Sequence, residues 1–221
     1  MTGRRISAYA KILRPAMAGL RMTFFCIVLF SPPTYAEENP LIDLQQSIPG
    51  LVVDVRYATA DNFMKEVLYP ESRVLLRREV AEKLARVQVK LKERGLSIKI
   101  FDAYRPLAVQ KKMWAKFPLE GYVANPAKGS NHNRGAAVDV TLVDKEGKEL
   151  PMPSAYDEFS ERSHRDYAGG TQEERDNRKI LSDAMESEGF VGIRTEWWHF
   201  DDKDAKTYPV LDLPFSSVSE K

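Results

Sequence analysis

The chain has 221 residues, of which 43% are hydrophobic, and this length is enough for one domain with a packed core. Its 33 Lys and Arg against 32 Asp and Glu give a formal charge of +1, whereas a nucleic-acid-binding surface needs a clear basic excess. One Cys excludes an intramolecular disulfide and any site built from several cysteines. Three His leave little room for a His-rich metal cluster, but they are enough for a mixed site of His and carboxylates.

The first 36 residues differ in composition from the rest of the chain. They contain five basic residues and no acid, with a nine-residue apolar run from Met22 to Phe30 and a small residue, Ala36, at their end. These features are typical of a secretory signal peptide, and the run is shorter than the roughly 20 apolar residues that span a bilayer. We expect residues 1–36 to be a signal peptide and residues 37–221 to form the domain. The alternative is an N-terminal anchor or a buried core helix.

Removal of residues 1–36 would change the charge of the chain. Taking five from the 33 basic residues leaves 28 against 32 acidic ones, so the remaining 185 residues have a formal charge of −4. They contain no Cys, because Cys26 lies in the removed segment, and an oxidising compartment would not affect them. We expect an exported, periplasmic protein without nucleic-acid partners and without a stable membrane anchor after cleavage. A non-functional signal would leave it in the cytoplasm.

After residue 40 the sequence has no repeats and no low-complexity linker. Apolar periodicity, helix caps and β-branched runs predict the following elements in chain order. The first half has a helix over 76–91 closed by Gly95, a strand over 96–101 and a helix from Pro106 to about Phe117. The second half has a strand over 136–143, a hairpin turn around Gly147, a helix capped by Thr171 and Glu174 and closed by Gly189, and strands over 190–193 and 197–200. Helices mixed with a hairpin-connected sheet, without a repeating βαβ pattern, indicate an α+β fold with a mainly antiparallel sheet and flanking helices.

Two of the three His lie in segments rich in polar functional groups. His132 precedes Asp139 by seven residues, and Gly135 between them indicates a loop that leads into a strand carrying Asp139. Glu196 and His199 are three residues apart, a spacing that places two side chains on opposite faces of a regular strand. If both serve one site, the chain must turn or bulge between them.

These four side chains suit metal-assisted hydrolysis. Two imidazoles and one carboxylate, from His132, Asp139 and His199, make a three-ligand zinc site that leaves the fourth position to water. The metal lowers the pKa of that water to about 7. Glu196 lies outside the ligand set and suits the transfer of the water's proton to a leaving amine. Spacing alone leaves open the alternative that both His are structural residues without a metal.

The wider pattern resembles a known family. Residues 130–139 (SNHNRGAAVD) and 196–199 (EWWH) are similar to the paired signature of the zinc D-alanyl-D-alanine dipeptidases, the VanX-like group. Further blocks that resemble the family, in family order, lie at 53–63, 101–106, 151–159, 161–164 and 186–190. The resemblance therefore covers nearly the whole chain after residue 36.

The resemblance implies catalytic roles for named residues. One Zn²⁺ per chain would be bound by His132, Asp139 and His199. Glu196 would act first as the catalytic base and then as the acid. Arg105 would stabilise the oxyanion that develops in the reaction, as a fixed cation near developing charge does. The alternative for Arg105 is a structural ion pair at the surface.

The resemblance also places substrate contacts. Tyr57, Ser130 and Asp157 fall where the family holds its substrate, and the Asp157 carboxylate suits the free ammonium of a dipeptide. His164 lies in a family block, but the ligand set is complete without it, so we expect it to be structural. The stretch between residues 117 and 122 is shorter than in well-known members, and the rim of the site is expected to differ.

The implied activity is zinc-dependent hydrolysis of D-alanyl-D-alanine to two D-alanine by metal-activated water. Members that confer glycopeptide resistance act in the cytoplasm, whereas an exported enzyme would act in peptidoglycan turnover or salvage. One alternative is a related D,D- or L,D-carboxypeptidase or endopeptidase of peptidoglycan with a more open site. Another is a non-catalytic zinc-stabilised binding module, in which a spare carboxylate such as Glu196 has no purpose.

Overall fold

The computed structural model describes residues 40–218, and the expected signal peptide at 1–36 lies outside this range. The helices are α1 Leu44–Ser47, α2 Arg78–Lys92, α3 Leu107–Lys116 and α4 Gln172–Glu186. The strands are β1 Leu41–Asp43, β2 Val52–Val53, β3 Leu75–Arg77, β4 Ser97–Asp102, β5 Ala137–Val143, β6 Phe190–Ile193 and β7 Glu196–Asp202. Short 3-10 helices lie at η1 Arg56–Ala58, η2 His132–Arg134, η3 Glu161–Ser163, η4 Ala205–Thr207 and η5 Phe215–Ser217. Among the described residues, no helix has the length and apolar character that a membrane crossing requires.

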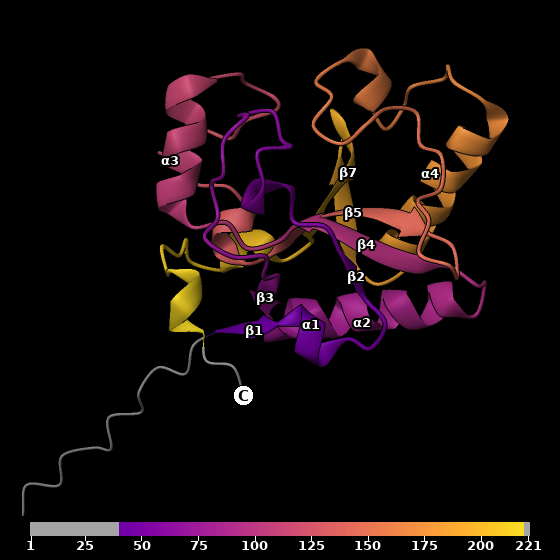
Figure 1. Ribbon diagram of the computed structural model, residues 1–221, viewed down its shortest axis with the longest axis horizontal. Helices are drawn as coiled ribbons and strands as arrows, with labels where there is room; N and C mark the ends of the chain where they lie inside the picture. The colour runs from indigo at the N-terminus through magenta and orange to yellow at the C-terminus, as the bar shows by residue number, and fades with distance from the viewer. Residues whose placement is uncertain (1–39, 219–221) are drawn as a thin grey trace, which may run out of the picture. The chain divides into compact units, whose positions relative to one another are not determined.

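A five-stranded sheet with the order β2-β4-β5-β7-β6 organises the structure. Strand β2 runs parallel to β4, and the other neighbouring pairs are antiparallel. A separate two-stranded sheet pairs β1 with β3 in antiparallel fashion. Figure 1 shows α2 and α4 flanking the larger sheet, and the two helices contact each other as well as its strands. This mixture confirms the expected α+β class with a mainly antiparallel sheet.

Helix α2 forms where the apolar spacing predicts a helix. Its apolar side chains recur at three- and four-residue intervals and are fully buried: Val80, Leu84, Val87 and Leu91. Gly95 follows with a φ of +71°, in the left-handed region where a side chain would be strained. The helix begins at Arg78, two residues later than predicted, because Leu76 belongs to strand β3.

Helices α4 and α3 begin at caps that are readable in the sequence. The Thr171 hydroxyl accepts a hydrogen bond from the Glu174 amide at 3.1 Å, and the Glu174 carboxylate accepts one from the Thr171 amide at 2.6 Å. This confirms the predicted capping box. Pro106 was expected to be the first residue of helix α3. It is instead the N-cap, because its ψ of 141° is extended, and the helix starts at Leu107.

Strand β5 forms over Ala137–Val143, and all seven of its residues are buried. The chain then turns at Gly147, which has a φ of +82° and donates its amide hydrogen to the Asp144 carbonyl at 3.0 Å. The residues after the turn form an isolated bridge between Val143 and Glu149 rather than another strand. The turn is therefore as expected, and β5 is a central strand with both faces covered.

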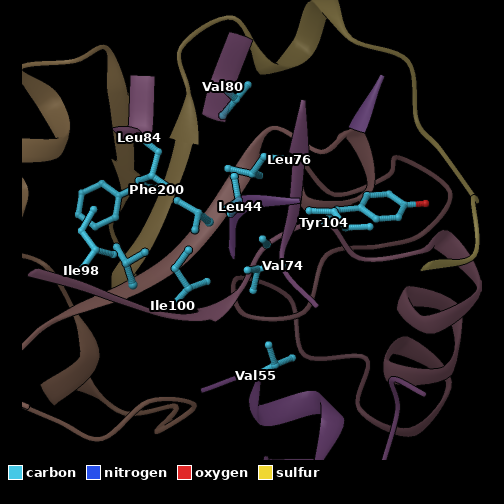
Figure 2. Close-up of a cluster of buried hydrophobic side chains, with 14 of the residues drawn as sticks. Leu44, Val55, Val74, Leu76, Val80, Leu84, Ile98, Ile100, Tyr104 and Phe200 are labelled. Atoms are coloured by element: carbon cyan, nitrogen blue, oxygen red, sulfur yellow. The ribbon is translucent and has the colours of Figure 1, made fainter. Parts of the chain in front are cut away.

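The hydrophobic core lies between α2 and the sheet. Figure 2 shows Leu84 of α2 near Ile98 of β4 and Phe200 of β7, and all three side chains are 0% exposed. Full burial of one such side chain contributes about 1.5–3 kcal/mol to folding. Because β5 and β7 also carry Asp139 and His199, the packing of this core determines the spacing of the polar groups described below.

Candidate active site

Three side chains with metal-ligating groups meet where η2 leads into β5. His132 lies in η2, while Asp139 on β5 and His199 on β7 are direct partners across the antiparallel ladder. Gly135 turns the chain from η2 into β5 with a φ of +66°, and a Cβ there would lie 2.5 Å from the Leu41 side chain. This turn places His132 beside Asp139, although seven positions separate them in the sequence.

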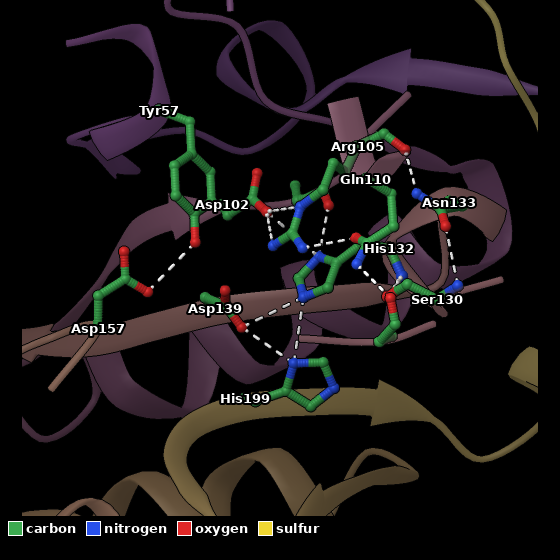
Figure 3. A network of polar contacts seen from close by, with 12 residues as sticks. Tyr57, Asp102, Arg105, Gln110, Ser130, His132, Asn133, Asp139, Asp157 and His199 are labelled. Carbon is green, nitrogen blue, oxygen red and sulfur yellow. Dashed lines mark hydrogen bonds and ion pairs between the residues drawn. The ribbon is translucent and has the colours of Figure 1, made fainter. Parts of the chain in front are cut away.

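The ligating atoms of these residues surround a common point. His132 Nε2 lies 3.1 Å from His199 Nδ1 and 3.4 Å from Asp139 Oδ1. His199 Nδ1 lies 3.0 Å from Asp139 Oδ1, and Figure 3 marks this contact with a dashed line. Within the described residues, these three are the group whose ligand atoms all lie within 4.8 Å of one another. The structure therefore brings together the three ligands expected from the sequence.

The outer atoms of these side chains are occupied by other partners. His132 Nδ1 lies 2.7 Å from a backbone carbonyl oxygen, and His199 Nε2 lies 2.9 Å from Asp201 Oδ1. Metal binding requires neutral rings, and in that form each ring donates its N–H to its outward acceptor and directs the lone pair of its other nitrogen to the common point. The Tyr156 hydroxyl donates to Asp139 Oδ2 at 3.0 Å, which leaves Oδ1 facing the same point. Three electron-pair donors thus converge there, an arrangement that fits a bound cation.

The charges around this point keep the carboxylate ionised. Burial alone would raise the pKa of Asp139, but the imidazoles of His132 and His199 hold it below its usual value. Burial alone would lower the pKa of His199, but the carboxylates of Asp201 and Asp139 raise it well above its usual value. Asp139 is therefore available as an anionic ligand across the physiological pH range.

Strand β7 departs from regular pairing between Glu196 and His199. In the ladder with β6, Glu196 pairs with Ile193, whereas Phe200 pairs with Gly192, so the register shifts between these pairs. The extra residues on β7 form a bulge, and Glu196 Oε2 lies 4.0 Å from His199 Nδ1. The predicted irregularity of this strand is confirmed. It places Glu196 and His199 on the same side of β7, whereas a regular strand would place them on opposite faces.

The carboxyl group of Glu196 lies in a low-dielectric environment. Burial raises its pKa to about 8, while the nearby His199 works in the opposite direction. Glu196 is not one of the three metal-ligating residues, but its carboxyl group lies beside them. A carboxyl group whose pKa lies near neutral pH suits proton transfer in both directions.

Arg105 is held rigidly just after β4. Its Nε and Nη2 donate to Asp102 Oδ2 at 3.1 and 2.7 Å, and its Nη1 donates to Gln110 Oε1 at 2.8 Å. The guanidinium lies 5.1 Å from the centre of the Tyr57 ring, and Tyr69 donates to the other oxygen of Asp102. The ion pair considered as an alternative is therefore present, but it is buried rather than at the surface. It orients a cation that also lines the cavity described below.

Asp157 presents an unsatisfied carboxylate oxygen. Its Oδ1 accepts a hydrogen bond from the Tyr57 hydroxyl at 3.2 Å, while its Oδ2 is buried and has no hydrogen-bond partner. Burial raises the pKa of Asp157 to about 7, and the charge of Asp139 adds to this effect. The backbone of Asp157 has a φ of +61°, which is uncommon for a residue other than glycine. A ligand that donates hydrogen bonds or carries positive charge would satisfy this group.

All eight site residues expected from the sequence line one cavity of about 260 Å³. Ser130 lies in the loop before η2, and its hydroxyl oxygen accepts a hydrogen bond from the His132 amide at 3.2 Å. Ser130 thus both supports a ligand residue and contributes a hydroxyl group to the cavity wall. Figure 3 shows Asp157 with Tyr57 on one side of the ligand group and Ser130 on the other.

The third histidine, His164, lies outside the ligand group. Its Nε2 is 3.2 Å from the Tyr122 hydroxyl, and its carbonyl oxygen accepts a hydrogen bond from Arg178. The ring of Tyr122 lies 4.9 Å from that of Phe159, and both residues line the cavity. This arrangement agrees with the expected structural role of His164, which here supports an aromatic rim.

Three positioning residues were not singled out from the sequence. Asp102 holds Arg105, Asp201 holds His199, and Tyr156 holds Asp139. Signals for two of them exist, because Asp201 shares a strand face with His199 two residues earlier and Asp102 precedes Arg105 by three residues. The contact of Tyr156 joins segments 17 residues apart, and no local pattern indicates it.

Comparison with known proteins adds an independent finding. A family model described as D-ala-D-ala dipeptidase matches residues 37–220. The D-alanyl-D-alanine dipeptidase of Escherichia coli K12 is 38% identical over 181 residues, which cover 82% of this chain and 94% of that protein. The proteins of the same name from Enterococcus faecium and Enterococcus faecalis V583 are 34% and 32% identical; the matches cover 77% and 80% of this chain and 96% and 95% of the two proteins.

Proposed function

The chain belongs to the D-alanyl-D-alanine dipeptidase family of metallopeptidases, and from this we propose that it hydrolyses D-alanyl-D-alanine to two molecules of D-alanine with one Zn²⁺ per chain. The observation that carries the proposal is the convergence of His132, Asp139 and His199 beside Glu196 in one cavity. A binding module without turnover would have no use for a buried carboxyl group next to the ligands.

The donor set fits zinc. His132 Nε2, Asp139 Oδ1 and His199 Nδ1 would hold the ion, since two imidazole nitrogens and one carboxylate oxygen match the three protein ligands of catalytic zinc sites. When bound, Zn²⁺ lowers the pKa of a water molecule to about 7 and polarises a carbonyl group. The outward hydrogen bonds hold both rings in place, and once the rings are neutral these bonds leave the ligating nitrogens aimed at the ion.

Glu196 carries the proton transfer in this proposal. Its Oε2 lies 4.0 Å from the ligating nitrogen of His199, which places it beside the ligand group. It accepts a proton from the attacking water and returns it to the amine that leaves. Burial raises the pKa of this carboxyl and the charge of a bound cation would lower it, and a general acid and base works best when these opposing effects leave its pKa near the operating pH.

Arg105 stabilises the negative charge that develops on the peptide oxygen. Burial alone would lower the pKa of its guanidinium, but Asp102 raises it well above the usual value, so the group remains charged. Asp102 and Gln110 hold it in place before the substrate arrives, and a preorganised cation needs no reorganisation during the reaction.

Asp157 and Tyr57 recognise the free ammonium group of the substrate. The unpartnered Asp157 Oδ2 accepts hydrogen bonds from the ammonium, and Tyr57 orients the carboxylate through its own hydroxyl. Ser130 contacts a polar group of the substrate from the opposite side of the ligands. A substrate acylated at its amine would lose the charge that Asp157 pairs with, which supports a dipeptidase over a carboxypeptidase.

The test is a direct assay of the purified protein. We expect about one zinc ion per chain, hydrolysis of D-alanyl-D-alanine, and little or no hydrolysis of N-acetyl-D-alanyl-D-alanine. Cleavage of the acylated compound alone would instead indicate a carboxypeptidase. Zinc binding without turnover of either compound would indicate the binding module.

We also propose that the enzyme is exported to the periplasm, where it acts on D-alanyl-D-alanine released during peptidoglycan turnover. The support is the basic lead, the apolar run and Ala36 in residues 1–36, which lie outside the described residues. Cell fractionation with mass spectrometry of the N-terminus tests this. A soluble cytoplasmic protein that retains residues 1–36 would contradict export.

A further inference from the structure

Two cationic side chains line the candidate active-site cavity, and their surroundings differ. Arg105 is engaged by Asp102 and Gln110. Lys206 lies in η4 and is exposed, and within residues 40–218 its ammonium group forms no hydrogen bond or ion pair. Lys206 is therefore the cation that remains available to a ligand at this cavity.

The segment that carries Lys206 is fastened to the loop that carries Ser130. Arg134 Nη1 donates to the Tyr208 carbonyl oxygen, and the Leu211 amide donates to the Asn133 carbonyl oxygen at 2.8 Å. These bonds join the residues that directly follow η4 to Asn133 and Arg134. The backbone that carries Lys206 is thus held next to the loop that carries Ser130, and both residues line the cavity.

The opposite side of the cavity carries Asp157. Figure 3 shows Asp157 beside Tyr57 and Ser130 at the other end, with the imidazoles and Asp139 between them. A dipeptide whose central peptide group lies at the metal-ligating residues can direct one terminus toward Asp157 and the other toward Ser130, because these two residues lie on opposite sides of the ligand group.

A cation at the second end of the cavity would pair with the carboxylate of the substrate. The lining contains four carboxyl groups: Asp139, Asp157, Glu196 and Asp201. The proposed Zn²⁺ offsets part of this negative charge, and a further positive group that faces the substrate carboxylate attracts it. The positive charge of Arg105 is shared with Asp102, with which it forms an ion pair at 2.7 Å.

We propose that Lys206 binds the C-terminal carboxylate of the dipeptide substrate, together with the Ser130 hydroxyl, while Asp157 binds the ammonium group. The inference rests on the proposed dipeptidase function and adds to it the group that recognises the second terminus. The cavity then distinguishes a free dipeptide from longer or amidated peptides at its carboxyl end, as Asp157 does at its amino end. Lys206 is a specificity residue and does not take part in the proton transfers.

The experiment compares an acid with its amide. D-alanyl-D-alanine and D-alanyl-D-alaninamide are assayed with the wild-type protein and with Lys206→Met, which keeps the apolar stem and removes the charge. We expect Lys206→Met to raise KM for the acid by about tenfold with kcat unchanged, the usual worth of a charge-assisted hydrogen bond, and to leave KM for the amide unchanged. Lys206→Arg keeps a cation and should restore much of the affinity for the acid.

Lys203→Met is the matched control, because Lys203 is an exposed lysine of the same segment that does not line the cavity. It should change neither substrate's KM. Equal effects of Lys206→Met on acid and amide, or no effect on the acid, would overturn the inference while wild-type turnover still supports the proposed function.

Binding of D-alanyl-D-alanine to Glu196→Gln, with and without Lys206→Met, decides the question without turnover. A Kd that is about tenfold weaker in the double variant supports the inference, and equal Kd values overturn it. Absence of hydrolysis by the wild-type protein would reject the proposed function separately.

Discussion

Two buried polar clusters lie side by side in this protein, and they differ in how completely their groups are satisfied. Around Asp102, both carboxylate oxygens are used, by Tyr69 on one side and by Arg105 on the other. Around the metal-ligating residues, lone pairs converge and Asp157 Oδ2 has no partner. Buried polar groups are normally paired, so a complete cluster has a positioning role and an incomplete one is built to receive a ligand.

The largest effect is expected from Glu196→Gln, which removes the proton carrier from the incomplete cluster and retains its size. General acid and base groups contribute about 10²–10⁴-fold to catalysis, so kcat should fall by about 10³-fold. Because Glu196 is not among the proposed ligands, zinc content measured by atomic absorption should stay at the wild-type value. Retained hydrolysis in this variant would exclude the proposed role.

Asp102→Asn should lower the free energy of unfolding, because it disrupts the complete cluster around Asp102. It leaves the Arg105 guanidinium buried without a counter-charge, and breaking a buried pair costs about 3–5 kcal/mol. Urea denaturation measures the change. The control is Asp183→Asn, which breaks the exposed Lys179 pair at 2.7 Å and should cost at most about 0.5 kcal/mol. Equal losses in the two variants would remove the contrast between buried and exposed pairs.

Asp201→Asn should change the affinity of the site for zinc. The carboxylate of Asp201 accepts the N–H of His199 at 2.9 Å, and loss of such a partner weakens metal binding about 10- to 100-fold. Competition with a chromophoric chelator reports the zinc affinity directly. A variant with wild-type zinc affinity would show that this hydrogen bond does not support the ligand.

The smallest effect is expected on the pH dependence of stability, and it comes from the carboxyl group of Asp157. Its carboxyl has a pKa of about 7 in the folded chain, against about 3.9 when unfolded, so the folded state binds this proton more tightly. Its contribution to stability is therefore fully present below pH 4 and is lost as the pH rises through 7. Without substrate, Asp157→Asn should be more stable than the wild type at pH 8 by about 1 kcal/mol, and the difference should shrink toward pH 4. Thermal unfolding across this range checks the sign, and a variant that is less stable at pH 8 would contradict it.

The sequence alone predicted those features whose causes lie within a few residues. The buried stripe of α2, the Thr171 capping box and strand β5, which was predicted one residue too long at its start, were readable because periodicity and caps act locally. Pattern and resemblance together also named eight of the residues that line the cavity. The conditional prediction of an irregular β7 followed from the odd spacing of Glu196 and His199 and the period of a strand.

Tertiary structure decided what depends on pairing between distant segments. The partners of the site residues come from elsewhere in the chain: Tyr57 reaches Asp157 across 100 residues, and Tyr156 reaches Asp139 across 17. No local preference encodes such contacts, because they form only when the core between α2 and the sheet brings β4, β5 and β7 into register. The sequence thus determined which chemical groups are available, while packing decided which of them are satisfied internally and which are left for a ligand.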